Sequence, residues 1–384
     1  MTTDEFQRTH WEKEPLLVKR EDPSYYSGIL TVKDVDRIIS LSNANFGDLR
    51  IVRDGTETPI SSLASGGEIS GTNVLARMYE HYRDGSTIVL NSLQQRWEPL
   101  QRLTRSLGEQ VGARFAANVY VTPGGGRALA PHYDVHDVFV AQVHGTKRWR
   151  LHKAQQILPL KSNPFHLGEL DPSEPWEEFN LETGDLLYLP RGTIHSAVAE
   201  QTGSVHVAIG VHPVAWATIL EEAVQKAFES EVGFRTSLPM GFHRDSAQQD
   251  RIEAQFEILI DTLRKQLSPR ALRVAALQRA ASISHPVLTG HLIDLEQVDQ
   301  VSLSTRVRLR AGVRYAFQRA DDVAGLSFHN KTLRLPADLS VELEFILQTA
   351  GGSFTADEVP GDLDEGGRLV LLRKLIREGF LSID

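Results

Sequence analysis

Cysteine is absent from the 384-residue sequence, which removes several kinds of chemistry at once. Disulfides, thiolate zinc sites, iron–sulfur clusters and cysteine nucleophiles all depend on cysteine sulfur, so none of them can exist here. Any metal ion must therefore be held by imidazole or carboxylate side chains.

Long apolar runs are also absent. No stretch approaches the ~20 apolar residues that a membrane-spanning helix needs. The N-terminal sequence MTTDEFQRTHWEKEPLL lacks the basic segment and following apolar run of a secretory signal. We therefore expect a cytoplasmic protein that makes no membrane contact.

Basic side chains are in the minority, with 41 Lys and Arg against 50 Asp and Glu and a net charge of −9 at pH 7. A nucleic-acid-binding protein needs a basic face, so direct binding of nucleic acid is not expected. The acidic chain is compatible with a basic protein partner, although solubility alone also favours a charge of this size.

The pattern of residues that are present changes along the chain. Residues 30–110 mix helical stretches with turns, whereas residues 113–213 contain short runs rich in Val, Tyr, Leu and Ile, broken by Gly and Pro. Such runs are typical of strands, and several strands without intervening helices favour an antiparallel barrel or sandwich. We expect this first domain to span residues 1–213.

Two further domains are expected after the barrel. Residues 214–290 have a helical pattern that suits a dimer interface or packing against the barrel. The apolar residues on one face of its longest helix are Ile252, Phe256, Leu259, Leu263 and Leu267. Residues 291–384 show helix, short turn, second helix and terminal strand, the pattern of a winged-helix domain. Because this segment has 11 basic and 15 acidic residues, we interpret it as structural or protein-binding.

A candidate metal site begins in the sequence PHYDVHD, residues 131–137. Alternate side chains of a strand face the same way, so on a strand His132 and Asp134 would both reach one ion. Two histidines and one carboxylate form the facial triad that holds Fe(II) and leaves three positions open. Because H-x-D alone is a weak motif, the prediction depends on a third ligand, which His195 supplies in the distant sequence GDLLYLPRGTIHSA.

His136 continues the same alternation, so it is either a fourth ligand or part of the pocket wall. As a ligand it would remove an open coordination position and change the chemistry. The other histidines that we considered have no partner spacing that distinguishes them: His144, His152, His166 and His206.

An oxidation at Fe(II) needs electrons, and a 2-oxo acid can supply two of them by decarboxylation. The far carboxylate of such a co-substrate needs a cation inside the barrel, because a buried unpaired carboxylate is costly. In the strand KRWRLH, Lys147 alternates with Arg148 and shares its face with the apolar Trp149. We therefore expect Lys147 to point inward, and Arg148 and Arg150 to face solvent.

Two polar residues precede the metal ligands on the strand NVYVTP. Asn118 and Tyr120 are two positions apart and therefore share a face. They are candidates for hydrogen bonds to a co-substrate or for positioning the substrate.

These motifs resemble the JmjC-type Fe(II)/2-oxoglutarate oxygenases, and among them the cupin-4 group of ribosomal oxygenases. The two blocks that carry the resemblance are NVYVTP…GG…APHYDVHDVFVAQVHGTKRWRLH and LETGDLLYLPRGTIHSA. The N-terminal HWEKEPLLVKR, the helical segment and the C-terminal unit are also similar, so the resemblance covers nearly the whole chain. It implies an α+β protein with a double-stranded β-helix (cupin/JmjC jelly-roll) core, a helical dimerisation domain and a C-terminal winged-helix domain.

The resemblance also implies roles for single residues. It makes His132, Asp134 and His195 the iron ligands and pairs Lys147 with the C5 carboxylate of 2-oxoglutarate. It places Asn118 and Tyr120 in the co-substrate pocket. The strand SVHVAIGVHP departs from the family, because Ala208 and Gly210 stand where relatives often carry serine or threonine.

The implied function is that of an Fe(II)-dependent dioxygenase that uses 2-oxoglutarate and O₂ to hydroxylate a side chain in a protein or peptide. A basic ribosomal protein is one candidate substrate, and a homodimer is expected. Three alternatives stay open: a metal cupin enzyme without a 2-oxo acid, an N-methyl-lysine demethylase, and a non-catalytic binding protein. The presence of Lys147 argues against the first, and the intact triad argues against the last.

Overall fold

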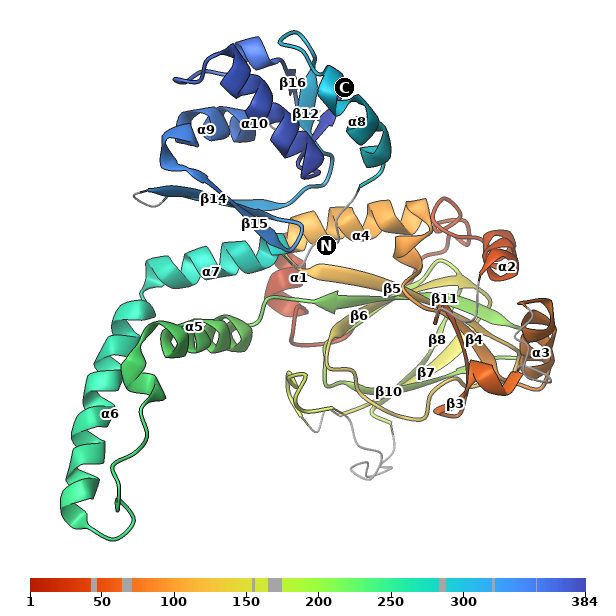
Figure 1. Ribbon diagram of the computed structural model, residues 1–384. Helices are drawn as coiled ribbons and strands as arrows, with labels where there is room; N and C mark the ends of the chain where they lie inside the picture. Colours follow the sequence, from red (N-terminus) through yellow and green to blue (C-terminus); the bar gives the residue numbers. More distant parts are fainter. Residues whose placement is uncertain are drawn as a thin grey trace. The chain divides into compact units, whose positions relative to one another are not determined.

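The computed structural model describes residues 1–42, 47–63, 71–153, 156–164, 175–282, 288–319, 322–349 and 351–384. The chain divides into two compact units, Met1–Pro213 and Val214–Asp384 (Figure 1). No helix within these described ranges is long and apolar enough to cross a membrane.

Strands dominate the N-terminal unit. Its helices are α1 (Thr3–Thr9), α2 (Val32–Leu41), α3 (Gly71–Arg83) and α4 (Glu98–Val111). Its strands are β1 (Leu16–Val18), β2 (Leu49–Arg53), β3 (Thr56–Thr58), β4 (Thr87–Leu90), β5 (Arg114–Thr122), β6 (Asp137–His144), β7 (Lys147–His152), β8 (Glu177–Leu181), β9 (Leu186–Leu189), β10 (Ile194–Ala199) and β11 (Ser204–His212).

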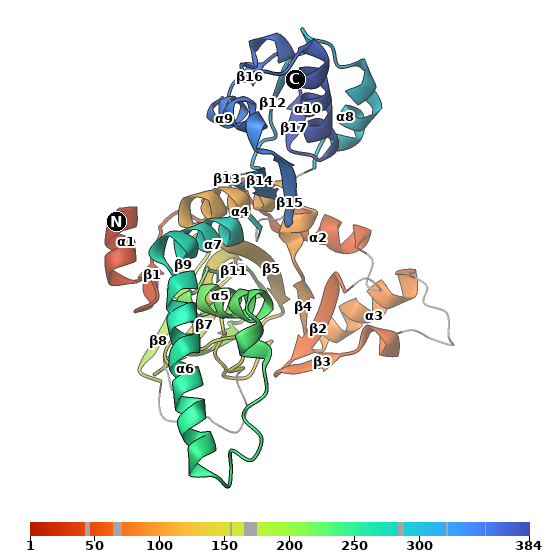
Figure 2. The same ribbon diagram turned by 60° about the vertical axis from the view of Figure 1, so that its left-hand side comes forward.

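These strands form two antiparallel sheets that face each other. The larger sheet has the order β1-β9-β6-β11-β5-β4-β2-β3, and the smaller has the order β10-β7-β8. The succession β5, β4, β2 and β3 in the larger sheet can be followed in Figure 2. Val138 and Val140 of β6 pack between the sheets against Trp149 and Leu151 of β7. The expectation of an antiparallel barrel or sandwich for this region is confirmed.

Strand β5 shows how the sequence directs its two faces. Phe115, Ala117 and Val119 are buried in a core that also contains residues of α2, α3 and α4. Because side chains alternate along a strand, the intervening Asn118 and Tyr120 face the space between the two sheets, where they line a cavity. One strand therefore builds the outer core and one wall of the cavity.

The region before the barrel contains more strand than we expected. Strands β2, β3 and β4 extend the larger sheet, where β4 pairs with β5, although residues 30–110 were interpreted as helices and turns. At the end of this region a 3₁₀ turn covers Leu93–Gln95, and α4 begins at Glu98. Pro99 lies in the first turn of α4, where its missing N–H is tolerated.

The C-terminal unit mixes helices with two small sheets. Its helices are α5 (Trp216–Ser230), α6 (Ser246–Gln266), α7 (Pro269–Ser282), α8 (His291–Gln297), α9 (Ser340–Gln348) and α10 (Glu365–Arg377). Its strands are β12 (Val307–Leu309), β13 (Tyr315–Arg319), β14 (Val323–Phe328), β15 (Lys331–Pro336), β16 (Ser353–Phe354) and β17 (Leu381–Ile383). The sheets have the orders β16-β12-β17 and β13-β14-β15.

The terminal segment has the expected order of helix α9, helix α10 and strand β17, with the short strand β16 between the helices. The sheet β13-β14-β15 was not expected. A core that includes Leu343, Leu375 and Phe380 joins these helices and strands. A separate domain boundary at residue 290 stays a prediction.

Candidate metal centre

The three predicted ligands come together although they are far apart in the sequence. The backbones of His132 and His195 form an isolated antiparallel bridge, in which His132 N donates to His195 O at 3.1 Å and His195 N donates to His132 O at 2.8 Å. This bridge fixes the two histidines side by side. His195 lies on β10, and Asp134 follows His132 in the loop that leads to β6.

Our expectation that residues 131–137 form a strand is wrong. The segment is a loop with a single bridge at His132, and β6 begins only at Asp137. The strand alternation therefore does not explain why His132 and Asp134 face the same point. The position of Asp134 is instead supported by a hydrogen bond in which Gly192 N donates to Asp134 O at 3.0 Å.

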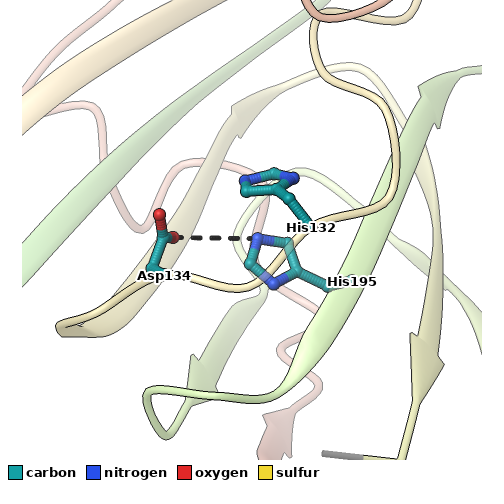
Figure 3. A group of neighbouring side chains, drawn as sticks. All are labelled: His132, Asp134 and His195. Atoms are coloured by element: carbon teal, nitrogen blue, oxygen red, sulfur yellow. Dashed lines mark ion pairs between the residues drawn. The ribbon is translucent and has the colours of Figure 1, made fainter. Parts of the chain in front are cut away.

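The ligand atoms are close enough to bind one ion. One side-chain atom from each of His132, Asp134 and His195 lies within 4.8 Å of the others, and His195 Nε2 is 3.8 Å from Asp134 Oδ2 (Figure 3). The Nδ1 atoms of both histidines face backbone carbonyls, at 2.8 Å from Ala130 O and 2.9 Å from Thr193 O. Because a carbonyl only accepts, each Nδ1 carries the proton and each Nε2 lone pair is free for a metal.

The charge states also suit metal binding. Burial, assisted by the adjacent His132, lowers the pKa of His195 to about 4, so the imidazole is neutral at pH 7. Burial raises the pKa of Asp134, but the surrounding histidines, led by His136 and His132, lower it overall. A neutral imidazole and an ionised carboxylate are the forms that bind a metal. This donor set fits Fe(II) in a facial triad.

His136 forms part of the pocket wall and is not one of the three clustered ligands. Its Nδ1 donates to Asp137 O at 3.2 Å, and its ring meets that of His212 edge to face at a centroid distance of 4.9 Å. Gly210 lies directly behind the ring, since a Cβ at that position would be 3.2 Å from His136 Cε1. This arrangement favours the expectation that His136 is part of the pocket wall.

A cavity of about 350 Å³ opens beside the ligands and is lined by both sheets. Lys147 points into it from β7 and is 2% exposed, while Arg148 and Arg150 lie outside and pair with Glu178. The predicted orientation of this strand is therefore confirmed. Lys147 Nζ donates to Thr122 Oγ1 at 3.2 Å, and burial lowers the pKa of Lys147 to about 7.

Asn118 and Tyr120 also line the cavity, but they already have protein partners. Asn118 Oδ1 accepts a hydrogen bond from Ser92 N at 2.9 Å, which leaves its amide NH₂ for a ligand. The Tyr120 ring stacks on that of His206 at 4.9 Å between centroids. Burial, with a smaller contribution from Asp134, raises the pKa of Tyr120 to about 12.

His206 is the cavity residue that sequence reasoning missed. It is buried on β11, and its Nδ1 lies 3.5 Å from Lys147 Nζ. Burial, assisted by the charge of Lys147, lowers the pKa of His206 well below its usual value, so it is neutral. The signal was present, because His206 lies at alternate positions with Ala208 and Gly210, the two residues at which this strand departs from the family, and all three line the cavity. His166, which we had set aside, lies outside the described residues.

Comparison with known proteins relates the barrel to the JmjC domain and to ribosomal oxygenases. Residues 92–219 match the family model described as the JmjC domain. The chain is 29% identical to chicken ribosomal oxygenase 1 over 99% of its own length and 70% of that protein. It is 31% identical to human ribosomal oxygenase 1 over 77% of its length, but it spans only 48% of that relative. A mosquito (Culex quinquefasciatus) protein named bifunctional lysine-specific demethylase and histidyl-hydroxylase NO66 is 29% identical over 82% of the chain and 49% of that protein.

Solved structures show the same fold. The Escherichia coli ycfD structure covers 100% of this chain and 98% of its own, with a TM-score of 0.58 and 18% identity. A second structure, of the E. coli ribosomal oxygenase YcfD in complex with cobalt and 2-oxoglutarate, has a TM-score of 0.57 and 17% identity over the same coverage. The barrel therefore has the JmjC/cupin fold.

Proposed function

Since the chain belongs to the JmjC-type ribosomal oxygenase group, we propose that it is an Fe(II)- and 2-oxoglutarate-dependent oxygenase that hydroxylates a side chain in a protein or peptide. The observation that carries this proposal is the convergence of two features in one cavity. The triad of His132, Asp134 and His195 lies at its edge, and the buried cation Lys147 lies in its wall.

Bound Fe(II) would supply the dioxygen chemistry, in which one oxygen atom converts 2-oxoglutarate to succinate and carbon dioxide and the other enters a C–H bond of the substrate. The chain's own residues hold the reactants. His132, Asp134 and His195 occupy one side of the metal position and leave the cavity side open for the co-substrate.

Lys147 would anchor the far carboxylate of 2-oxoglutarate. Within the described part of the chain no carboxylate pairs with Lys147, and its contacts are the hydroxyl of Thr122 and the imidazole of His206. Trp149 Nε1 is a second buried donor at the cavity that has no partner among the described residues. An unpaired buried cation and an unpaired buried donor are both costly, and an anionic ligand would satisfy them.

The remaining polar groups of the cavity are suited to orienting a bound ligand rather than to balancing its charge. Asn118 can donate from its amide, and the rigid stack of Tyr120 on His206 defines one wall. We assign these three residues to positioning the co-substrate and the substrate side chain. Arg50, which also lines the cavity, adds a cation toward Tyr120.

An anaerobic titration tests the co-substrate. Protein loaded with Fe(II) should develop a visible metal-to-ligand charge-transfer band when 2-oxoglutarate is added. The band should disappear in His132→Ala and persist in Arg148→Ala, which removes a neighbouring cation on the outer face of β7. A missing band in the iron-loaded wild-type protein would instead favour a metal cupin that uses no 2-oxo acid.

For the substrate we propose a basic ribosomal protein. The names of the relatives support this choice, and so does the net charge of −9, which favours association with a cationic polypeptide. Incubation with fractionated ribosomal proteins, Fe(II) and 2-oxoglutarate should add the mass of one oxygen atom to a single peptide. If only non-ribosomal peptides gain this mass, the oxygenase assignment stands and the substrate assignment fails.

N-methyl-lysine demethylation is the second candidate, and the name of the mosquito relative is the observation that favours it. The two reactions share every step up to hydroxylation, but hydroxylation of an N-methyl group ends with release of formaldehyde. Formaldehyde and loss of a methyl group from a methylated lysine peptide would identify the demethylase. A stable mass gain would identify the hydroxylase.

We also propose that the helices of the C-terminal unit form a homodimer. Several large apolar side chains on α5 and α6 are exposed in the single chain: Trp216, Leu220, Phe228, Phe256 and Ile258. Exposed apolar side chains gathered on neighbouring elements mark protein interfaces. Sedimentation equilibrium should give twice the chain mass, and Phe256→Glu combined with Ile258→Glu should give the monomer. A monomeric wild-type protein would contradict the proposal.

The last part of this unit has the elements of a winged helix. Helices α8, α9 and α10 accompany the sheet β16-β12-β17, and α10 precedes the terminal strand β17. Since residues 291–384 carry excess negative charge, we propose that this domain binds protein and not nucleic acid. Binding of the full chain to duplex DNA at physiological salt would contradict this.

A further inference from the structure

A cluster of charged side chains, most of them buried, lies on the segments that carry the metal ligands but does not line the cavity. It consists of Glu12, Asp137 and Arg191, which we call the brace. Asp137 is fully buried, and the side chains of Arg191 and Glu12 are 9% and 30% exposed. None of the three is a metal ligand or lines the cavity.

The brace is held by three short contacts. Arg191 donates to Asp137 twice, from its backbone N to Oδ1 at 2.9 Å and from Nη1 to Oδ2 at 3.1 Å. The same Nη1 donates to Glu12 Oε1 at 2.6 Å. Both acids therefore depend on one guanidinium, and Arg191 is fixed through its backbone as well as its side chain.

The position of the brace connects the two segments that supply the metal ligands. Asp137 begins β6, three residues after Asp134, and Arg191 lies in the turn four residues before His195. Next to Arg191, Gly192 N donates to Asp134 O. The Arg191–Asp137 pair thus connects the loop that contains Asp134 to the turn that leads to His195.

The N-terminal segment completes the brace. Glu12 has a left-handed backbone, with φ of 56°, and its N donates to the hydroxyl of Tyr188 at 3.0 Å. Trp11 stacks on the same Tyr188 ring at 6.3 Å, and β1 pairs with β9. A positive φ is unfavourable for a residue other than glycine, so surrounding contacts must hold it in place. The contacts with Tyr188 do this for Glu12, whose carboxylate then accepts the hydrogen bond from Arg191.

Stability alone does not explain a buried cluster of this kind. Desolvation of the charges offsets most of the attraction between them, and apolar replacements are often as stable. The value of such a cluster lies in fixing one geometry, and groups outside the ligand set of a metal site commonly set the affinity for the metal in this way. We propose that Glu12, Arg191 and Asp137 are positioning residues that hold the two ligand-bearing segments at the separation that the metal requires.

The test measures metal affinity rather than turnover, and it rests on the metal site of the proposed function. The dissociation constant for Mn(II) is measured by titration of the full-length protein, with the electron paramagnetic resonance spectrum of the bound ion as a second readout. Asp137→Asn removes the central charge and should raise the dissociation constant about tenfold. Glu12→Gln, at the more exposed end, should raise it by less and leave the fold intact.

Asp185→Asn is the matched control. Asp185 is also a buried carboxylate of this barrel with partners near the N-terminus: Lys19 Nζ donates to it at 2.7 Å and Arg20 N at 2.8 Å. Asp185 immediately precedes β9, whereas Arg191 of the brace lies just beyond the end of this strand. Asp185→Asn should lower the thermal midpoint of unfolding and leave the Mn(II) affinity and spectrum unchanged.

The possible results separate the brace from the site itself. If the wild-type protein and His132→Ala bind Mn(II) equally weakly, the proposed metal site fails. If the wild type binds but Glu12→Gln and Asp137→Asn match it, the brace has no positioning role. An equal loss of affinity in Asp185→Asn would likewise overturn the proposal. Should Asp137→Asn not fold, Glu12→Gln alone decides.

Discussion

Two buried cations, Lys147 in the N-terminal unit and Arg310 in the C-terminal unit, have opposite kinds of surroundings. In the N-terminal unit Lys147 is buried against an open cavity with no carboxylate partner among the described residues. In the C-terminal unit the buried guanidinium of Arg310 pairs with the buried carboxylate of Asp294. Arg310 also donates to Gly379 O at 3.1 Å and to Thr289 O at 2.9 Å.

This difference separates a binding site from a structural contact. The Arg310–Asp294 pair has all its partners within the protein, so its effect is on the architecture of the C-terminal unit. Lys147 has only neutral neighbours, so its charge is compensated only when an anion enters the cavity. The two kinds of buried charge should therefore respond differently to mutation, one through stability and the other through ligand binding.

The largest effect is expected from the metal ligands. His132→Ala or Asp134→Ala should reduce 2-oxoglutarate turnover to the level of metal-free protein. Each variant removes one of the three metal ligands, and the two that remain do not form the facial triad. The fold should persist, since His132 keeps its backbone bridge to His195. Succinate formation and far-ultraviolet circular dichroism measure the two properties. Full activity in either variant would contradict the assigned triad.

Removing Asp294 should act on stability alone. Asp294→Ala leaves the Arg310 charge buried without its carboxylate, which costs about 3–5 kcal/mol in the free energy of unfolding. Urea denaturation of the full-length chain measures this loss, and 2-oxoglutarate binding should stay unchanged. A variant with wild-type stability would show that the pair has no structural role and would weaken the contrast between the units.

Lys147→Ala should act on binding alone. Losing one partner of a buried charge pair costs about 2–5 kcal/mol, so the dissociation constant of 2-oxoglutarate should rise by roughly 30-fold or more. The unfolding free energy should not fall, because the variant removes a desolvated cation. The exposed Arg150→Ala is the matched control on the same strand. Unchanged affinity in Lys147→Ala would assign the co-substrate to another cation.

The pH dependence of binding provides a smaller effect. Since burial lowers the pKa of Lys147 to about 7, the free protein loses the cation as the pH rises above neutrality. The dissociation constant of 2-oxoglutarate should therefore be flat below about pH 7 and rise by up to about tenfold per pH unit above it. His206, which faces Lys147, stays neutral across this window because its pKa is already lowered well below the usual value.

Lys147→Arg is the control for this titration, because arginine keeps its charge throughout. The variant should bind 2-oxoglutarate with no rise in the dissociation constant over the same range. If the wild type and Lys147→Arg show the same slope, another group controls the pH dependence.

The sequence indicated the ligand set more reliably than its local geometry. His132, Asp134 and His195 could be proposed from residue type and motif, and Lys147 from strand alternation with apolar neighbours. The strand assigned to residues 131–137 was wrong because a bridge to His195, 63 residues away, shapes that loop. Strand β4 was missed because all four of its residues are buried, so it has no alternation to detect.

The contacts of the brace are harder to predict from the sequence than the metal ligands are. Glu12 and Arg191 are 179 residues apart in the sequence, and neither lies in a periodic pattern that relates one to the other. Such contacts follow from the pairing of β1 with β9, which brings the N-terminal segment to the turn before His195. Local propensity carries no information about a pairing of this kind.

The smallest effect is expected at Gly210, where the cavity wall departs from the family. In Gly210→Ala the new Cβ would be 3.2–3.4 Å from the His136 ring, so the ring must shift at a cost of about 1 kcal/mol. We propose that His136 contacts the substrate and that Lys147 anchors the co-substrate in another part of the cavity. The KM for the protein substrate should therefore rise while the dissociation constant of 2-oxoglutarate stays constant.

The double variant His136→Ala/Gly210→Ala separates crowding from other causes. Without the imidazole the added methyl group has space, so Gly210→Ala should have no further effect in the His136→Ala background. If Gly210→Ala instead weakens 2-oxoglutarate binding in both backgrounds, the methyl group acts on the co-substrate directly. The wall formed by Gly210 and His136 would then belong to the same part of the cavity as Lys147, and the division of the cavity into a substrate side and a co-substrate side would be wrong.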